Sequence, residues 1–195
     1  MSEMDDIIAA DLLQSRNDSI TFTRELTKVT DFYAEVYSLA HIIRYSMKPV
    51  IRHESVAEHS YFVALGVVLL FEVYYFDLPT SILIAVCHDV PEIKISDVNH
   101  MVKKSFPDVA KAIKIAENAI IENLPSTVKS GAKMYDGQTT ESKIVHLADA
   151  MQCMQYSSNE MRMGNTGYMK EVYENSSKRV NELHVELESC RKWKK

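Results

Sequence analysis

The feature that most constrains the fold of this chain is the stretch at residues 81–92, SILIAVCHDVPE. Its first seven residues are almost entirely apolar, which is typical of an element packed inside a protein. The run ends in His88 and Asp89, and Glu92 follows just beyond a proline. A carboxylate at the end of a buried helix is costly unless a cation or hydrogen-bond donors compensate it, and a divalent cation that binds imidazole and carboxylate would do so. In the alternative, the pair lies at a solvated helix end where His88 caps carbonyl groups.

The composition indicates one helical domain. The 195 residues suffice for one full hydrophobic core, and 46% of them are apolar while 25% are charged. Only five glycines and five prolines are present, which argues against a β-sandwich rich in turns. We therefore predict an all-α chain of six or more helices.

The charge and the cysteines restrict the partners and the compartment. A net charge of -5 provides no general basic field for a nucleic-acid polymer, although a small nucleotide needs only one or two local cations. The three cysteines are widely spaced without a CxxC pair, which fits a reducing cytoplasm. The acidic N-terminus has no signal-peptide pattern. The longest apolar stretch, residues 62–73, is too short to span a bilayer and contains Glu72, so we expect no membrane partner.

Two polar signals divide the first part of the chain. Residues 3–15 have the apolar spacing of a short amphipathic helix, and the polar run at 16–19 is predicted to end it. Thr30 is predicted to cap a second helix over about residues 31–46, because a threonine hydroxyl accepts hydrogen bonds from the free amides of a helix start. Pro49 excludes continuation of that helix.

A capping box marks the start of the next helix. Ser55 and Glu58 form the pattern S-x-x-E directly before an apolar run, which places the first helical residue at Val56. This helix is predicted to extend to about Tyr75 and, because it is apolar nearly all round, to lie at the centre of the fold. The same spacing arguments predict helices at about residues 77–89, 107–123, 140–163 and 167–190, a loop with a helical turn at 93–106, and a loop at 125–138.

Four side chains that are costly to bury lie on these apolar helices: His59, His88, Asp89 and Asp149. A single histidine of this kind is more often a packed core residue than a ligand. Two imidazoles and two carboxylates on three helices, however, match a six-coordinate divalent cation with positions left for water and substrate. The set predicts a site for one metal ion.

These residues, in this order, resemble the H…HD…D pattern of the HD-domain phosphohydrolase superfamily, which is all-α and metal-dependent. Three segments strengthen the resemblance: ESVAEHS at 54–60, HDVPE at 88–92 with Asp97 five residues later, and LADA at 147–150. They are similar to segments of the 5′-deoxynucleotidases of the YfbR type and of the phage dATP triphosphohydrolases of the DatZ type. The similarity covers about residues 30–165. It implies a single HD domain over the whole chain, a helical bundle with an N-terminal extension and a C-terminal helix.

The resemblance implies that the four residues above bind one divalent metal ion, and mixed nitrogen and oxygen ligands admit Co²⁺, Mn²⁺, Zn²⁺, Mg²⁺ or Fe²⁺. Glu92 and Asp97 stand where the family has its catalytic carboxylates. A metal lowers the pKa of a bound water, and a nearby carboxylate can orient or deprotonate that water. Without the resemblance, Glu92 is a solvated residue at a helix end, and Asp97 is a turn or N-cap residue.

Substrate contacts are implied at four further positions. Arg44 and Tyr45 stand where the nucleotidases have an Arg-Trp pair that contacts nucleotide; a guanidinium suits phosphate, and the change from Trp to Tyr leaves the discrimination against ribose open. Lys103 matches a family lysine near the phosphate, and Met47 lies where an apolar side chain can press on the base. The alternatives are a surface lysine and loop packing. Further candidates for phosphate contact, or else solvated side chains, are Arg52, His53 and Lys104.

The resemblance therefore implies hydrolysis of a deoxynucleoside 5′-monophosphate to deoxynucleoside and phosphate. The first alternative is a triphosphohydrolase that converts dATP to deoxyadenosine and triphosphate at the same metal site. The second is an inactive HD protein that binds nucleotide, although the presence of every ligand together with Glu92 and Asp97 opposes it. Hydrolysis of guanosine tetraphosphate is less well supported by the motifs. Relatives and the apolar faces of the last two helices suggest a homo-oligomer, such as a dimer.

Overall fold

The computed structural model describes residues 3–98 and 100–193, and over these residues it is all-α, as predicted. Two isolated β-bridges, Ile43 with Ser55 and Tyr74 with Arg191, are the extended pairings in this part of the chain. The contacts divide the chain into two compact units, one up to Ser38 and one from Leu39 onward. The single-domain organisation stays a prediction. Within the described ranges, no helix combines the length and hydropathy needed to cross a membrane.

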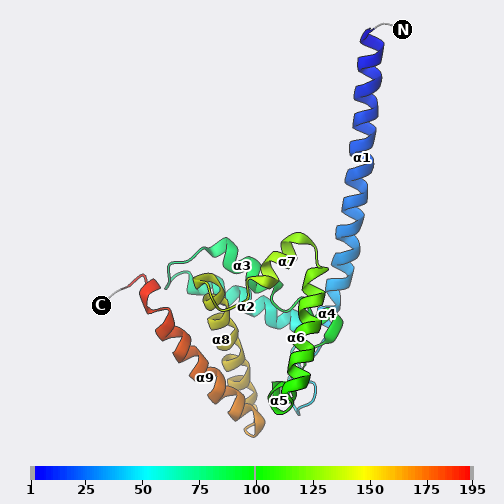
Figure 1. Ribbon diagram of the computed structural model, residues 1–195. Helices are drawn as coiled ribbons and strands as arrows, with labels where there is room; N and C mark the ends of the chain where they lie inside the picture. Colours follow the sequence, from blue (N-terminus) through cyan, green and yellow to red (C-terminus); the bar gives the residue numbers. More distant parts are fainter. Residues whose placement is uncertain (1–2, 99, 194–195) are drawn as a thin grey trace. The chain divides into compact units, whose positions relative to one another are not determined.

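The first unit is one helix, α1 (Glu3–Val36), which Figure 1 shows as an unbroken rod. The predicted break at residues 16–19 is wrong, because Arg16 favours a helix, the other three residues disfavour it only weakly, and none is Gly or Pro. Thr30 does not cap a helix; its hydroxyl donates to the Leu26 carbonyl, 2.9 Å away, within α1. The helix expected to run to residue 46 instead ends at Val36 and is followed by the 3₁₀ turn η1 (Tyr37–Ala40).

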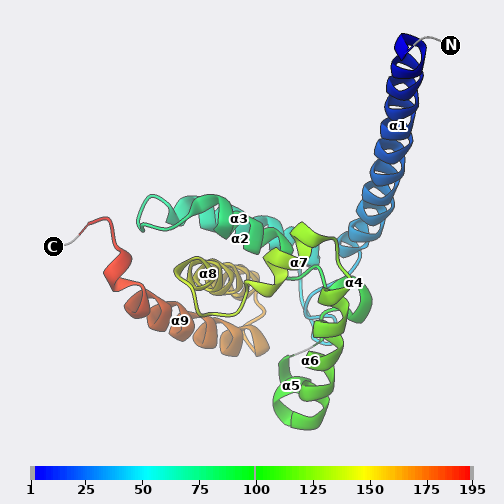
Figure 2. The ribbon, with the colours of Figure 1, turned by 45° about the horizontal axis from the view of Figure 1, so that its top comes forward.

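The second unit is a helical bundle whose core lies around α8. Its elements are α2 (Val56–Leu70), α3 (Leu78–Cys87), α4 (Glu92–Ile95), α5 (His100–Ser105), α6 (Pro107–Glu122), α7 (Ser126–Lys133), α8 (Thr140–Arg162), α9 (Tyr168–Glu186) and η2 (Glu188–Cys190). Helix α8 packs against α9 on one side and against α2 and α3 on the other (Figures 1 and 2). The buried core contains Val63, Val67, Ile84, Ile144, Leu147 and Leu183.

The capping box forms as predicted and fixes the first turn of α2. The Glu58 amide donates to Ser55 Oγ at 3.1 Å, and the Ser55 amide donates to Glu58 Oε2 at 2.9 Å. The helix therefore begins at Val56, which places His59 in its buried first turn. The helix is not buried on all sides, although its apolar sequence predicts this for a helix at the centre of the fold. It ends at Leu70, and one face remains open to solvent, with exposed fractions of 40–61% for Phe62, Leu65, Val68 and Leu69.

The later helices agree with the predicted spans, with two differences. The expected loops contain helices α4, α5 and α7, and the last helix stops at Glu186 before η2. The sequence does not predict α7, because a glycine such as Gly131 is more typical of a loop than of a helix. Its lack of a side chain lets α7 approach α3 closely: a Cβ at this position would lie 2.8 Å from Cys87 Cβ and 2.9 Å from the Leu83 carbonyl oxygen.

A buried carboxylate ties the loop before α2 to the end of α8. Glu160 accepts hydrogen bonds from the backbone amides of Ile51 at 2.8 Å and Arg52 at 2.7 Å, and from Asn165 Nδ2 at 2.8 Å. Burial by itself disfavours the charged form, but these hydrogen bonds outweigh it and lower the pKa of Glu160 below its usual range. The carboxylate therefore stabilises the folded state at neutral pH.

We expect Glu160→Ala to lower the free energy of unfolding by about 2–4 kcal/mol at pH 7, because two backbone amides and Asn165 lose a buried, charged acceptor. Denaturant titration followed by circular dichroism measures this difference. Since the folded pKa is depressed, the contribution of Glu160 is present above about pH 4 and is lost as the pH falls further. The exposed Glu174→Ala on α9 is the control and should change stability by less than about 0.5 kcal/mol. Equal stability of the two variants would show that Glu160 does not anchor the loop.

Candidate metal centre

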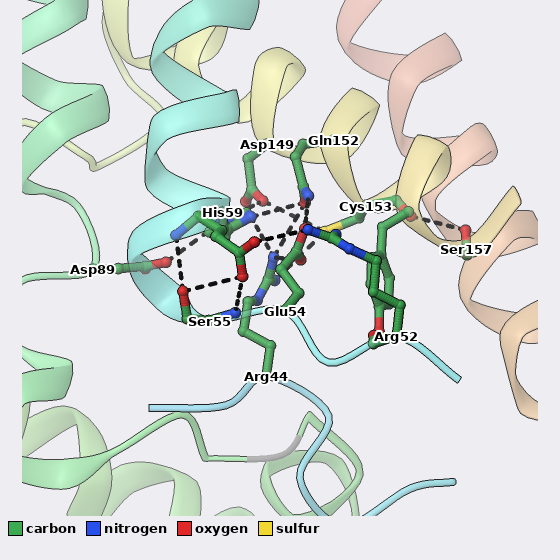
Figure 3. Close-up of polar contacts among 12 residues, drawn as sticks. Arg44, Arg52, Glu54, Ser55, His59, Asp89, Asp149, Gln152, Cys153 and Ser157 are labelled. Carbon is green, nitrogen blue, oxygen red and sulfur yellow. Dashed lines mark hydrogen bonds and ion pairs between the residues drawn. The ribbon is translucent and has the colours of Figure 1, made fainter. Parts of the chain in front are cut away.

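The four predicted ligands meet at one point of the second unit. His59 comes from the first turn of α2, His88 and Asp89 follow the last residue of α3, and Asp149 lies on α8. His59 Nε2 lies 3.4 Å from His88 Nε2, 3.4 Å from Asp89 Oδ2 and 3.4 Å from Asp149 Oδ1. His88 Nε2 lies 3.1 Å from Asp89 Oδ2. Residues 90 positions apart in the chain thus bring two nitrogens and two oxygens together. Figure 3 shows three of these side chains, His59, Asp89 and Asp149.

These spacings fit a divalent cation. Ligand bonds of about 2.0–2.2 Å at tetrahedral to octahedral angles place neighbouring donor atoms roughly 3.0–3.5 Å apart. The observed separations of 3.1–3.4 Å lie in that interval. His59, His88 and Asp89 also form the His and carboxylate cluster whose donor atoms all lie within 4.8 Å of one another. The mixed donor set suits Mn²⁺, Co²⁺, Zn²⁺ or Fe²⁺ and admits Mg²⁺.

The other ring nitrogens of both histidines are held by neighbours. His88 Nδ1 lies 2.7 Å from the Ala85 carbonyl oxygen, an acceptor, so Nδ1 carries a proton and Nε2 is the nitrogen left for a metal. His59 Nδ1 lies 2.8 Å from Gln152 Oε1. Both imidazoles are therefore arranged to bind a metal through Nε2, with the second nitrogen oriented as in known metal sites.

The surrounding charges shift the pKa values of the two histidines in opposite directions. Burial and the Arg44 guanidinium lower the pKa of His59 to about 4. Burial also disfavours the charged form of His88, but the Asp89 carboxylate outweighs it and raises the pKa of His88 to about 9. At neutral pH one imidazole is neutral and the other protonated, so a metal that binds here must displace the proton of His88.

Tyr135 orients the fourth ligand. Its hydroxyl, on the segment between α7 and α8, donates to Asp149 Oδ2 at 2.8 Å and leaves Oδ1 facing His59. The same ring lies 3.9 Å, centroid to centroid, from that of His146. Burial and the Asp149 carboxylate raise the pKa of Tyr135 well above its usual range, so the hydroxyl keeps its proton.

We expect Tyr135→Phe to weaken metal binding about 10-fold, because loss of a hydrogen bond behind a metal ligand typically costs 10- to 100-fold in affinity. Titration of the metal-free protein with Co²⁺ measures the change. Tyr61→Phe, at a 63% exposed position on α2, is the matched control and should bind as the wild type does. Identical affinities for all three proteins would exclude an orienting role for Tyr135.

Glu92 lies close to the predicted ligands as a half-buried carboxylate. It is the first residue of α4, directly after Pro91. Burial, together with the negative charges of Asp89 and Asp97, raises the pKa of Glu92 to about 8. Its Oε2 atom is buried without a hydrogen-bond partner among the residues that the structure describes. A carboxylate with these properties is typical of proton-transfer sites.

A cavity of about 680 Å³ opens beside the centre. Asp149 lines it together with the predicted substrate residues Arg44, Tyr45 and Lys103 and the predicted catalytic residue Asp97. Lys103 also lies 3.5 Å from Glu117. Met47, in contrast, is 70% exposed and is outside the cavity lining, so the structure does not bring it to the other site residues.

Sequence reasoning missed several polar residues at the site. Gln152 and Tyr135 belong to no recognised motif, and Glu54 stands in the segment ESVAEHS without a predicted role. His146 and Tyr168 line the cavity without having been singled out. Gln152 lies three residues after Asp149, on the same face of α8, and this helical spacing is the one signal that points to it.

Comparison with known proteins supports the resemblance. A family model described as 5′-deoxynucleotidase YfbR-like matches residues 31–192. A search of curated proteins finds no match. Among solved structures, a Pyrococcus horikoshii protein is 22% identical with a TM-score of 0.70, covering 82% of this chain and 94% of its own. A conserved hypothetical protein from Pyrococcus furiosus is 24% identical with a TM-score of 0.69, covering 80% and 92%. An HD-domain phosphohydrolase from Listeria innocua is 21% identical with a TM-score of 0.65, covering 82% of each chain. At these identities the structures show a shared fold.

Proposed function

The chain belongs to the YfbR-like 5′-deoxynucleotidase family, and on that basis we propose that it hydrolyses deoxynucleoside 5′-monophosphates to deoxynucleoside and phosphate with one divalent metal ion. The observation that carries the proposal is the convergence of His59, His88 and two aspartates beside a cavity lined by cationic side chains. The four donor atoms would hold the metal. When bound, it would polarise a phosphoryl oxygen and lower the pKa of a coordinated water.

Glu92 is the proposed general base. Hydrolysis forms a bond from a water oxygen to phosphorus and breaks the bond from phosphorus to the ester oxygen of the sugar. The attacking water loses a proton, and the unpartnered Glu92 carboxylate is the proposed acceptor; the departing sugar oxygen gains a proton in turn, which Glu92 or solvent would return. Burial and the charges of Asp89 and Asp97 raise the pKa of Glu92, which brings its proton exchange toward neutral pH. Asp97, in the cavity lining, would hold the water or a sugar hydroxyl.

Arg44 and Lys103 are the proposed phosphate contacts, since both line the cavity and offer N–H donors to anionic oxygens. Tyr45 would pack on the sugar or base. Its ring stacks on that of Tyr156, with centroids 5.4 Å apart and planes within 3°, and its backbone has φ of 56°. A non-glycine residue with positive φ is strained, which supports a functional reason for its placement. Met47 stays a weaker candidate for base contact because it lies outside the cavity.

A second candidate function is removal of triphosphate from a deoxynucleoside triphosphate such as dATP. Two additional cationic residues, Lys104 and Arg179, line the same cavity as Arg44 and Lys103. Four cationic side chains around one cavity are more than a single phosphate needs. Arg179 is partly neutralised, however, by Glu182 at 3.4 Å and Glu186 at 3.7 Å, which favours the monophosphate.

One assay tests these functions together. Purified protein, freed of metal and reloaded with Mn²⁺, Co²⁺, Zn²⁺ or Mg²⁺, is incubated with deoxynucleoside monophosphates, ribonucleoside monophosphates and deoxynucleoside triphosphates. We expect orthophosphate from the deoxynucleoside monophosphates. Tripolyphosphate from dATP would replace the first function with the second. Binding of nucleotides without turnover under any metal would instead show a nucleotide-binding protein. A homo-oligomeric state and a cytoplasmic location stay predictions, and light scattering of the purified protein tests the first of them.

A further inference from the structure

A buried polar chain extends from His59 away from the metal centre (Figure 3). His59 Nδ1 lies 2.8 Å from Gln152 Oε1, and Gln152 Nε2 donates to Glu54 Oε1 at 2.6 Å. Glu54 and His59 are each 1% exposed, so water does not replace these contacts. The chain joins the segment before α2, the first turn of α2 and the middle of α8.

The order of donors and acceptors in this chain determines which nitrogen of His59 carries the proton. A carboxylate only accepts hydrogen bonds, so Glu54 requires the NH₂ group of the Gln152 amide to face it. The amide oxygen must then face His59, and an oxygen can only accept. His59 Nδ1 is therefore the protonated nitrogen, and Nε2 keeps the lone pair that a metal needs.

The same two residues hold Arg44. Its Nη1 lies 3.2 Å from Gln152 Oε1 and 3.5 Å from Glu54 Oε2, and its Nη2 lies 3.6 Å from Cys153 Sγ. Nη1 also lies against His59 Nδ1. Nη1 has oxygen acceptors in Gln152 and Glu54 for its two hydrogens, so it does not require Nδ1 as an acceptor. The order set by Glu54 and Gln152 then directs the proton of Nδ1 at Gln152. The guanidinium is thereby fixed at the wall of the cavity that it lines.

We propose that Glu54 and Gln152 are positioning residues, which set the tautomer of His59 for metal binding and hold Arg44 at the substrate cavity. Neither residue touches the metal or the reacting atoms; both act through a ligand and through the arginine. This proposal rests on the proposed metal-dependent function, and it adds the pair of side chains on which the geometry of that site depends.

Exchange of the two side chains is the sharpest test. Two contacts orient the Gln152 amide: Glu54 accepts from Nε2, and Arg44 donates to Oε1. Glu54→Gln keeps the shape but removes the requirement set by the shorter contact, so the amide can turn its NH₂ group to His59 and favour the Nε2–H tautomer. We expect Co²⁺ to bind this variant about 10- to 100-fold more weakly. The double variant Glu54→Gln/Gln152→Glu restores the order: the new amide at 54 donates to the new carboxylate at 152, whose other oxygen accepts from Nδ1. We expect the double variant to bind Co²⁺ more tightly than Glu54→Gln does and to recover at least a third of the loss, measured as the change in the logarithm of the Co²⁺ affinity.

The readouts separate positioning from a general loss of structure. Co²⁺ affinity and the visible Co²⁺ spectrum report the ligand set, and thermal melts by circular dichroism report folding. Gln155→Glu, which adds a charge at an exposed position of the same helix, is the matched control and should bind Co²⁺ as the wild type does. Wild-type affinity in Glu54→Gln, or no recovery in a folded double variant, would overturn the proposal.

A measurement on the unaltered protein keeps the test independent of variants. Long-range ¹H–¹⁵N correlation spectra of the metal-free protein distinguish the two neutral tautomers of His59, and we expect Nδ1–H. An Nε2–H tautomer would overturn the proposal. If the wild type itself does not bind Co²⁺, the metal site of the proposed function fails; if it binds and the exchange has no effect, only the positioning role fails.

Discussion

His88→Ala is expected to lose both the metal and the activity. The substitution removes one of the four converging donor atoms and leaves Asp89 Oδ2 without its 3.1 Å neighbour. Because the metal would supply several kcal/mol of transition-state stabilisation, we expect turnover to fall at least about 1,000-fold. Metal content after dialysis, measured by elemental analysis, should fall to background. Asp149→Ala, which removes a ligand from a different helix, should behave in the same way.

His53→Ala is the matched control for His88→Ala, because His53 is an exposed histidine outside the cavity lining. It should keep both the metal and wild-type turnover. The two measurements are made on the same preparations, so that activity is compared at known metal content. Wild-type turnover in metal-free His88→Ala would refute the metal centre as the site of the chemistry.

Glu92→Gln is expected to separate binding from catalysis. The amide keeps the size of the side chain but cannot accept the proton of the attacking water, so turnover should fall about 100- to 10,000-fold. Metal content and nucleotide affinity should stay within about threefold of the wild type, since Glu92 is not among the four ligands. Single-turnover kinetics together with calorimetric titration of a deoxynucleoside monophosphate measure the two properties.

The control for Glu92→Gln is Glu72→Gln, at an exposed position just after α2. It makes the same chemical change away from the cavity and should leave turnover unaltered. A fully active Glu92→Gln would remove this residue from the mechanism. Loss of the metal from Glu92→Gln would instead give it a structural role at the centre.

The parts of the fold that the sequence predicts well are those set by local chemistry. The capping box at Ser55 and Glu58 requires only contacts within one helical turn, and α2 begins where it predicts. The four predicted ligands, which the structure brings together, could also be singled out, because His and Asp are costly on apolar helices whatever those helices pack against. Prolines mark the starts of α3 and α6 for the same local reason.

The misses come from contacts between distant segments or from weak local signals. Gln152 acquires its role from Glu54, 98 residues earlier in the chain, and no local pattern encodes that pairing. One face of α2 is exposed although its apolar sequence predicts burial, because apolar content alone does not say which faces of a helix pack against other elements. The polar run at 16–19 does not end α1, since each of its residues costs a helix at most about 0.7 kcal/mol.

Gly131 shows how narrow the tolerance to change is at a position that carries no chemistry. Even a methyl group there would meet Cys87 Cβ at 2.8 Å and the Leu83 carbonyl oxygen at 2.9 Å, so α3 or α7 would have to shift. Cys87 is the residue directly before His88, and a shift of α3 would carry His88 and Asp89 with it. A scan for functional positions that considers only polar side chains would pass over residue 131. A laboratory evolution library would nevertheless find it among the least permissive positions of the chain.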